Sequence, residues 1–427
     1  MKKSFFVCMI IVIHVITLSA QTTTRQVLTE AKAEAAGMSS ERLKRIDNLI
    51  QQYVDNKWIA GAAAIIVHDG KIAYYKGVAY DDIEKKTPLK RDAIFRIASQ
   101  TKAITSTAVM ILYEEGKFLL DDPISKYIPE FKNPKVLDKF NETDSSYTTV
   151  PAKREVTIRD LLTHTSGIDY AIIGSQKMTA IYAKQGIPSG IGTENKTLGS
   201  EIKKLARLPL AHQPGEKWTY GLNTDVLGYL VEVLSGMSLN DFFKKRIFEP
   251  LGMHDTYFYI PTEKHNRLAT LYTEDSLQHI MKRPDGGDGL HSDYPNRPGT
   301  YYSGGAGLSS TTYDYAVFLQ MFLNGGTYNG NRILSRSTVR MMTMNQIGDL
   351  NLGANKFGLG FEIVTEAGSS HSPNNVNTFD WGGYFSTTYW ADPKEKITAL
   401  VMTQIAPNSH GDLSDKFKAL VYQAIND

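Results

Sequence analysis

The sequence has a single cysteine, Cys8, and almost no excess charge, since 47 lysines and arginines stand against 45 aspartates and glutamates in 427 residues. No block of like charge occurs, so the composition gives no reason to expect binding to nucleic acid or to an anionic membrane. A single cysteine cannot form an intramolecular disulfide, and any thiolate chemistry would need Cys8 itself. The chain is long enough to bury a large core.

Cys8 lies in an N-terminal segment with the pattern of an export signal. Two lysines precede an apolar run over residues 5–18, which ends in Ser19-Ala20. The run is shorter than the ~20 residues of a membrane-spanning helix. We therefore predict a signal peptide at residues 1–20 and export to an oxidising compartment such as a periplasm. The mature chain would then have no cysteine and no stable membrane span.

Motifs of several enzyme classes are missing from the sequence. There is no G-x-S-x-G turn, no H-E-x-x-H, no G-x-x-x-x-G-K-[ST] loop and no G-x-G-x-x-G after a strand. The ten histidines show no paired ligand spacing, so we expect neither a metal nor another cofactor. His164 lies in a His-Thr-Ser-Gly turn, where a histidine is more often held by backbone groups than used as a base. We predict a structural role for it.

Apolar periodicity predicts regular structure near both ends of the chain. Residues 40–54 have the spacing of an amphipathic helix, and residues 61–77 form two apolar runs around Asp69-Gly70, a strong hairpin signal. A largely apolar helix is predicted from Ser99 to about Glu115, where Gly116 stops it. Strands return at 356–364, 384–391 and 397–404, and a closing helix follows at 413–425.

These elements predict an α/β (α+β) fold in which an antiparallel sheet is flanked by N- and C-terminal helices. Residues 40–95 and 350–427 would build the sheet part, and residues 96–349 would form a large inserted helical lobe. Residues 281–307 show no periodicity and are predicted to be a long surface loop. We expect one catalytic domain over residues 21–427, because no internal repeat or linker interrupts it.

The sequence Ser99-Gln100-Thr101-Lys102 carries the clearest chemical signal. Residues three apart share a helix face, so the Lys102 ammonium would lie beside the Ser99 hydroxyl and could take its proton. Ser200 and Lys203 have the same spacing, so the pattern alone does not decide between the two serines.

Two further features gain meaning only in combination with this pair. Tyr220 could relay a proton if a cation lies near its hydroxyl, and otherwise it is packing. Gly382 and Gly383 follow Trp381 at the entrance to a strand, where their backbone amides could face a developing oxyanion or could simply form a bend.

Six segments in this order resemble the serine β-lactamase and penicillin-binding-protein superfamily, in its class C-like branch with the family VIII carboxylesterases. The resemblance covers about residues 40–425. It rests on FRIASQTK, EEGKFLLDDPISKYIPEF, VTIRDLLTHTSGI, PGEKWTYGLNTDVLGYLVEVLSG, GGAGLSSTTYDYAVFLQMFLNGG and WGGYFSTTYWADPKEKI.

The resemblance implies roles for particular residues. It makes Ser99 the acylated nucleophile, Lys102 its proton acceptor and Tyr220 the general base and acid. It also implies an oxyanion hole formed by the backbone N–H groups of Ser99 and Tyr384, worth ~3 kcal/mol per donor. Ser200 becomes an incidental match.

Two departures from the family pattern bear on the substrate. The second family motif is commonly Tyr-x-Asn, whereas Asn223 lies one place late after Tyr220. The third is commonly Lys-Thr-Gly, whereas this chain has Trp381-Gly382-Gly383, as the esterase branch does. We expect Asn223 and these three residues to bind substrate, and tryptophan cannot hold a carboxylate as lysine does. The departure favours esters over penicillins.

We therefore expect an exported serine acyl-enzyme hydrolase that acts on an ester or amide, with a small-molecule ester or acyl donor as its partner. Three alternatives stay open: an acyltransferase that esterifies a bulky apolar alcohol such as a sterol, a β-lactamase or D,D-peptidase, and a non-catalytic penicillin-binding sensor. An aromatic pocket for the apolar partner, or simply core packing, would account for Trp218, Tyr301, Tyr302, Trp381, Tyr384, Phe385 and Tyr389.

Overall fold

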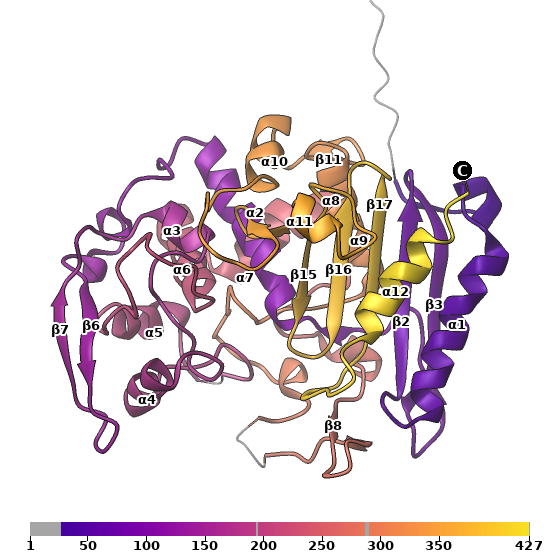
Figure 1. The fold of residues 1–427 in the computed structure, drawn as a ribbon, viewed down its shortest axis with the longest axis horizontal. Helices are drawn as coiled ribbons and strands as arrows, with labels where there is room; N and C mark the ends of the chain where they lie inside the picture. Colours follow the sequence, from indigo (N-terminus) through magenta and orange to yellow (C-terminus); the bar gives the residue numbers. More distant parts are fainter. Residues whose placement is uncertain (1–26, 194, 287–289, 427) are drawn as a thin grey trace, which may run out of the picture.

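The computed structural model describes residues 27–193, 195–286 and 290–426 (Figure 1). The predicted signal peptide at residues 1–20, with Cys8, lies outside these ranges. Among the described helices, none combines the length and the apolar character that crossing a membrane requires.

One main sheet joins the two ends of the chain (Figure 1). Its strands are β1 (Thr29–Glu30), β2 (Gly61–His68), β3 (Lys71–Asp82), β4 (Thr87–Pro88), β13 (Lys356–Phe357), β14 (Glu362–Ile363), β15 (Phe379–Gly383), β16 (Thr387–Asp392) and β17 (Ile397–Met402). Their order is β1-β3-β2-β17-β16-β15-β14-β13, with β4 paired to β3. Only the pairing of β1 with β3 is parallel. The predicted sheet from both chain ends is confirmed.

The hairpin of β2 and β3 turns at the predicted pair Asp69-Gly70. Both residues have positive φ, 48° and 76°, which is the geometry that a two-residue hairpin turn needs. At the centre of the sheet β2 pairs with β17, with Ala63 opposite Met402. The first and last parts of the chain therefore hold each other in one sheet.

Helices cover both faces of the sheet, and each central strand buries side chains on both sides. On one face lie α1 (Ser40–Asp55) and α12 (Leu413–Tyr422), and on the other lie α2 (Thr101–Glu114) and α9 (Thr312–Leu323). In β16, Tyr389 packs with α2 and α9, whereas its neighbour Trp390 packs with α1 and α12. This alternation follows from the period of two in a strand.

The predicted helix at 99–115 is present, with a tighter first turn. A 3₁₀ turn, η2 (Ala98–Gln100), leads directly into α2, which ends before Gly116 at φ 70°. Nearly all of α2 is buried because it lies between the sheet and the helical lobe.

The helical lobe has the expected position in the chain but contains more than helices. Its helices are α3 (Ile158–Leu162), α4 (Gln176–Lys184), α5 (Leu198–Leu205), α6 (Asn223–Ser235), α7 (Leu239–Phe243) and α8 (Glu249–Leu251); α10 (Arg336–Met342) and α11 (Glu366–Ser369) follow later. Short turns are η1 (Ala33–Ala36), η3 (Ile124–Lys126), η4 (Pro129–Phe131), η5 (Lys244–Phe248), η6 (Thr262–Arg267) and η7 (Tyr294–Asn296). Small strands are β5 (Phe95–Arg96), β6 (Lys135–Phe140), β7 (Tyr147–Pro151), β8 (Tyr272–Glu274), β9 (Ile280–Lys282), β10 (Ser309–Ser310), β11 (Thr327–Tyr328) and β12 (Asn331–Arg332).

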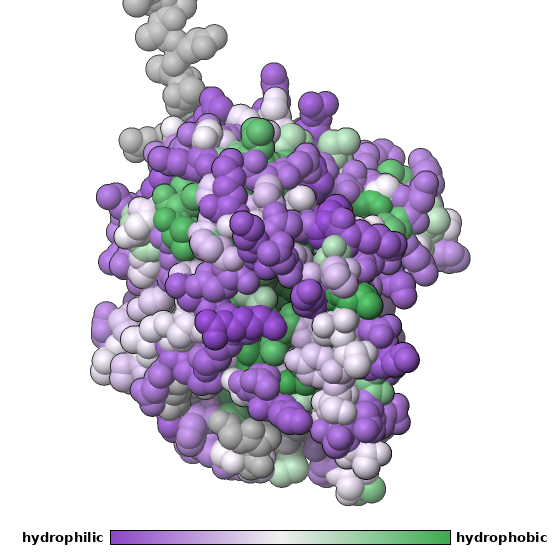
Figure 2. Space-filling model, turned by 90° about the vertical axis from the view of Figure 1, so that its left-hand side faces the viewer, coloured by the Kyte–Doolittle hydropathy of each residue, from purple (hydrophilic) through white to green (hydrophobic). Residues whose placement is uncertain are grey.

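The small hairpins escaped prediction because their side chains carry little apolar pattern. All of β7 is exposed and β6 buries only Val136 fully, so the pair gives no alternating signal. Within the predicted loop 281–307, β9 continues to residue 282 and η7 adds one short turn. The side of the lobe that Figure 2 faces is mostly hydrophilic, with hydrophobic side chains in small groups.

Candidate active site

Ser99 lies at the point where a short strand turns into the buried helix α2. Ala98 just before it has φ 40°, an unusual conformation for a residue with a side chain, and such strain is common beside reacting groups. The turn is held from other elements, because the Tyr315 hydroxyl donates to the Gln100 carbonyl at 2.7 Å and the Leu308 N–H donates to the Thr101 hydroxyl at 3.1 Å. The Ser99 side chain is left partly exposed at the tip of this turn.

Three side chains that the sequence singled out meet at this turn. The Tyr220 hydroxyl donates to Ser99 Oγ at 2.6 Å, and Lys102 Nζ lies 3.3 Å from the same oxygen. A nucleophile with two proton-transferring groups in hydrogen-bond reach is the arrangement that nucleophilic catalysis requires. The spacing of Ser99 and Lys102 thus places them in contact, and Tyr220 joins them from a segment 121 residues away.

Lys102 is the buried cation of this group, at 3% exposed. Its ammonium donates to the Gly305 carbonyl at 2.8 Å and lies 4.6 Å from the centre of the Tyr220 ring. Lys102 is thus a cation near Tyr220, the neighbour that the sequence made the condition for proton relay by the tyrosine. The catalytic role of Tyr220 stays a prediction.

A buried carboxyl behind Lys102 was not identified from the sequence. Asp225, on α6, is 1% exposed and accepts a hydrogen bond from the Ser303 hydroxyl at 2.6 Å. Burial raises the pKa of Asp225, while Ser303 and the charge of Lys102 lower it. An ionised Asp225 would balance the ammonium charge of Lys102. No motif of the sequence marks it, because its neighbours come from residues 303–305.

His164 does not contact Ser99. It is 2% exposed, and its Nδ1 accepts from the Asn223 side-chain amide at 2.9 Å. Burial, with a smaller contribution from the charge of Lys102, holds the pKa of His164 well below its usual range, so the ring is neutral. Its ring packs against Tyr220 with a centroid distance of 5.0 Å, so His164 supports the tyrosine from behind.

Asn223, predicted to bind substrate, is 0% exposed and does not line the cleft described below. Besides its bond to His164, it accepts a hydrogen bond from the Ser166 hydroxyl. This position corrects the prediction: in this structure Asn223 positions the residues beneath Tyr220. The one-place shift from the Tyr-x-Asn pattern gives the physical reason, since Asn223 begins α6 and turns inward.

The end of β15 packs tightly onto the Ser99 turn. A Cβ atom on Gly383 would lie 2.3 Å from the Ile97 carbonyl oxygen and 2.4 Å from Thr387 Oγ1, so only glycine allows this approach. The next residue, Tyr384, therefore follows directly beside the turn that carries Ser99. The oxyanion hole of the Ser99 and Tyr384 N–H groups stays a prediction.

Ser99 lines a cleft of about 530 Å³. On the helical-lobe side Trp381 forms part of the wall, with its ring centroid 5.5 Å from that of Tyr220 and 5.5 Å from that of Phe357. The lining residues are Ser99, Ile173, Tyr220, Glu362, Asp380, Trp381, Gly382, Gly383, Tyr384, Ser386, Thr387, Thr388, Val401, Thr403, Asn408, Gly411, Leu413, Ser414, Asp415 and Lys418. Trp381, Gly382 and Gly383 thus line the cleft, and their binding of substrate stays a prediction.

Only part of the predicted aromatic set reaches the cleft. Trp381 and Tyr384 line it, while Phe385 and Tyr389 are fully buried in the core. Trp218 stacks on Tyr220 one layer behind, at a centroid distance of 6.1 Å. The remaining two lie elsewhere: Tyr301 is buried and lines a separate small cavity, and Tyr302 packs on Phe258.

The competing Ser200 and Lys203 pair does not form a site. Ser200 is exposed and donates to the Thr197 carbonyl at 2.9 Å, whereas Lys203 forms an ion pair with Glu130 at 3.1 Å. The two side chains thus have other partners. Among the described residues, no group of three or more His, Cys, Asp or Glu side chains is placed to hold a metal ion.

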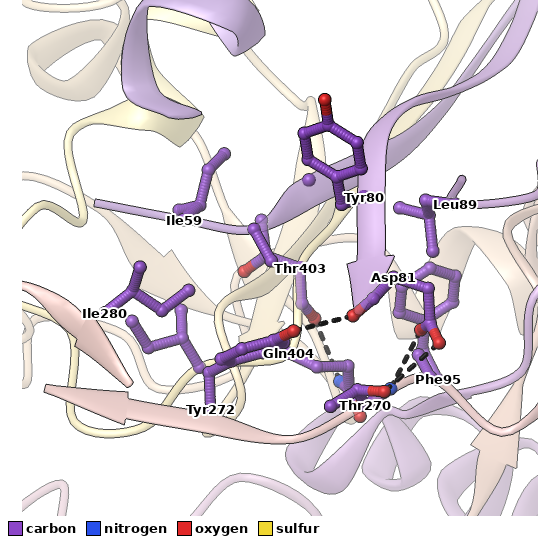
Figure 3. Close-up of a pocket in the computed structure, with 14 residues that line it drawn as sticks. Ile59, Tyr80, Asp81, Leu89, Phe95, Thr270, Tyr272, Ile280, Thr403 and Gln404 are labelled. Carbon is purple, nitrogen blue, oxygen red and sulfur yellow. Dashed lines mark hydrogen bonds between the residues drawn. The ribbon is translucent and has the colours of Figure 1, made fainter. Parts of the chain in front are cut away.

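A second cavity lies between β2, β3 and the end of β17, and the residues that line it include no serine, cysteine or lysine (Figure 3). Its volume is about 20 Å³, room for a single water. Around it Asp81 accepts from the Thr270 N–H and hydroxyl, and the Tyr272 hydroxyl donates to the Asp81 carbonyl. These bonds tie the lobe to the sheet, so the cavity is a packing feature and not a second reaction centre.

Comparison with known proteins agrees with this geometry. The beta-lactamase family model matches residues 46–423. A Mycobacterium tuberculosis protein is 35% identical over 376 residues, which covers 84% of this chain and 89% of that protein. Esterase EstB of Burkholderia gladioli is 28% identical over 396 residues, covering 88% of this chain and 94% of EstB. The solved structure of EstCE1, a hydrolase with promiscuous acyltransferase activity, superposes with a TM-score of 0.77 at 26% identity over 90% of this chain and 98% of its own. The chain belongs to the beta-lactamase family and is a serine hydrolase of that family.

Proposed function

We propose that the protein hydrolyses carboxylic esters through an acyl-enzyme on Ser99. The observation that carries the proposal is the contact of Ser99 Oγ with both the Tyr220 hydroxyl, at 2.6 Å, and Lys102 Nζ, at 3.3 Å, beside a Trp-Gly-Gly strand. The similarity to esterases supports the choice of esters.

The proposed reaction uses these groups in two steps. Tyr220 reacts as the phenolate, whose negative charge the Lys102 ammonium stabilises. Ser99 Oγ attacks the ester carbonyl carbon while its proton passes to the Tyr220 oxygen, which becomes the neutral hydroxyl. The C–O bond to the alcohol then breaks, and the alcohol leaves with that proton. A water molecule next attacks the acyl carbon, gives its proton to Tyr220, and Ser99 leaves reprotonated as the acid is released. The Ser99 and Tyr384 amides would hold the oxyanion in both steps.

The wall of the cleft argues against penicillins and peptides with a free carboxylate. Trp381 stands where a lysine would bind that carboxylate, and Asp380 and Glu362 add negative charge to the lining. Lys418 also lines the cleft but is already paired with Asp380 at 3.5 Å, so a carboxylate there would find no unpaired lysine in the lining and would meet like charge. The β-lactamase, D,D-peptidase and penicillin-sensing alternatives are therefore less favoured than esterase activity.

A second candidate is transfer of the acyl group to an apolar alcohol. Ile172 and Ile173 are 54% and 55% exposed, Ile173 lines the cleft, and Tyr384 is 43% exposed on its rim. Apolar side chains at the mouth would hold an apolar alcohol near Ser99 and favour it over water. A sterol added with p-nitrophenyl butyrate should then yield a sterol ester that mass spectrometry detects.

Export remains part of the proposal because residues 1–20 carry the signal pattern. Expression of the full chain in a Gram-negative host, followed by N-terminal sequencing of periplasmic protein, tests it. A new N-terminus near Gln21 is expected. An intact N-terminus on cytoplasmic protein would contradict export while leaving the esterase proposal intact.

The decisive test of catalysis is covalent labelling. A fluorophosphonate should add its mass to the wild-type protein and to Ser200→Ala, the matched control with the same local spacing, but not to Ser99→Ala. Turnover of p-nitrophenyl butyrate should fall about 10³-fold or more in Ser99→Ala. Full ester turnover by Ser99→Ala would overturn the proposal.

A further inference from the structure

The cleft extends past the reaction centre to the other face of the sheet. Trp381 faces Tyr220 and the helical lobe, so its neighbours in β15, Asp380 and Gly382, face the α12 side. The pairing confirms this, because Asp380 lies opposite Trp390, which packs against α12. Residues of both faces line one continuous cleft. Its second part, which we call the α12 arm, is lined by Asp380, Gly382, Thr388, Leu413, Ser414, Asp415 and Lys418.

Gly382 lines the cleft between Ser99 and this arm. A Cβ atom at Gly382 would lie 3.1 Å from the Thr387 carbonyl oxygen, a tight contact, and glycine places no side chain in the cleft at this point of the strand. Thr387, opposite Gly383 in the neighbouring strand, also lines the cleft and is 1% exposed. Its hydroxyl lies on the Ser99 side, where a Cβ atom on Gly383 would come within 2.4 Å of it.

The far end of the α12 arm carries an excess of negative charge. Asp380 and Lys418 lie 3.5 Å apart, with side chains only 17% and 14% exposed. Glu362, from β14, and Asp415, from α12, line the same region. This part of the lining thus holds three carboxyl groups and one lysine, which pairs with Asp380, while Glu362 accepts a hydrogen bond from the Asn355 side-chain amide at 2.6 Å. Lys418 is in addition 5.5 Å from the ring centre of Trp390, which holds it against the sheet.

We propose that the α12 arm binds a positively charged ammonium group of the substrate, at the end of a chain that reaches back over Gly382 to the carbonyl at Ser99. The inference rests on the proposed ester hydrolysis and names its substrate class: an ester with a cationic group remote from the reacting carbonyl. Asp380 is three residues from Gly383 in β15, which at the rise of a strand is ~10 Å. The cation therefore lies about that far from the reacting carbon.

The electrostatics of Asp380 agree with this ligand. Burial raises the pKa of Asp380 to about 7; the Lys418 charge opposes this, and Glu362 and Asp415 add to it. The carboxyl thus lacks enough positive charge to stay ionised well below neutral pH. A bound ammonium supplies that charge, so it binds more tightly as pH rises through about 7 and Asp380 ionises.

A pair of esters of the same shape tests the proposal. One is p-nitrophenyl 8-(trimethylammonio)octanoate, and the other is p-nitrophenyl 9,9-dimethyldecanoate, in which a carbon replaces the charged nitrogen. A second pair has these groups at the end of the alcohol part of butyrate esters. In one of the pairs the cationic ester should have a KM lower by about fivefold or more at pH 8, and the preference should shrink at pH 6.

Substitutions test whether the lower KM of the cationic ester depends on the α12 arm. Asp380→Asn and, at an exposed position, Asp415→Asn should bring the KM ratio of the pair toward one. Asp138→Asn, which removes a carboxyl from the distant β6 strand, should leave the ratio unchanged. Equal KM values in both pairs for the wild-type protein, or a preference that survives in Asp380→Asn, would overturn the proposal.

Failure of the esterase proposal can be told apart from failure of this one. Isothermal titration of the Ser99→Ala protein with the same esters measures the preference of the arm with no turnover. Tighter binding of the cationic ester without wild-type hydrolysis would refute the esterase reaction and keep the cation site. Hydrolysis of both esters with equal binding would refute the cation site and keep the esterase reaction.

Discussion

Replacing Gly383 by alanine tests whether the end of β15 helps to bind the oxyanion. The added methyl would lie 2.3 Å from the Ile97 carbonyl oxygen, where ordinary contact needs at least 3.4 Å. Gly383 does not have a positive φ, so alanine fits its backbone and the effect is purely one of space. The strand must move away from the Ser99 turn by ~1 Å to relieve the clash.

That shift would carry the Tyr384 N–H away from the oxygen it is predicted to bind. Loss of one oxyanion donor costs ~3 kcal/mol, or about 10²–10³-fold in kcat. The measurement is kcat and KM for p-nitrophenyl butyrate, together with the thermal midpoint. We expect kcat to fall by that factor with a smaller change in KM, because the oxyanion forms only in the transition state.

The neighbouring glycine gives a matched control. A methyl on Gly382 would come no closer than 3.1 Å to the Thr387 carbonyl oxygen, so Gly382→Ala should cost less than about tenfold in kcat. If Gly383→Ala keeps kcat within about threefold of wild type with an unchanged thermal midpoint, then Tyr384 does not donate to the oxyanion.

Three further predictions follow from other groups. Tyr220→Phe keeps the ring packing but removes the hydroxyl 2.6 Å from Ser99, so kcat for p-nitrophenyl butyrate should fall by about 10²–10⁴-fold; a kcat near wild type would leave Lys102 as the sole base. Nitrocefin should be hydrolysed far more slowly than p-nitrophenyl butyrate, because Trp381 offers no cation to its carboxylate, and comparable kcat/KM values would contradict this. Burial raises the pKa of Asp314 to about 7, so between about pH 4 and 7 the folded state holds a proton that the unfolded chain has released. The free energy of unfolding should then fall with rising pH, by up to about 1.4 kcal/mol per unit, and Asp314→Asn should flatten that slope in urea titrations.

The local part of the site could be predicted because helix geometry fixes it. Ser99 and Lys102 are three residues apart at the start of a helix, and their contact follows from that spacing. Ser200 and Lys203 have the same spacing yet form no pair, since each has a nearer partner. The spacing therefore indicated both serines as candidates, and only the surrounding segments distinguished Ser99 from Ser200.

The rest of the site depends on contacts between distant segments. Lys102 is held by the carbonyl of Gly305, 203 residues away, and the carboxyl behind it comes from Asp225. No periodicity reports such contacts, because loops bring these groups together. The aromatic residues were hard to place for a similar reason. Tyr389 is fully buried because its side chain is on the face of β16 that packs into the core, and which face that is depends on the strand register, which could not be predicted from the sequence.

The strand β15 combines the two determinants of the proposed substrate. Its side chains alternate, so Trp381 faces Tyr220, at the position where the family pattern commonly has a lysine, and Asp380 faces the α12 arm. The same strand thus disfavours an anionic group beside Ser99 and favours a cationic group one face away. Because residues of both faces line one cleft, the two preferences act on one molecule. A substrate that is neutral at the carbonyl and positive at its far end satisfies both.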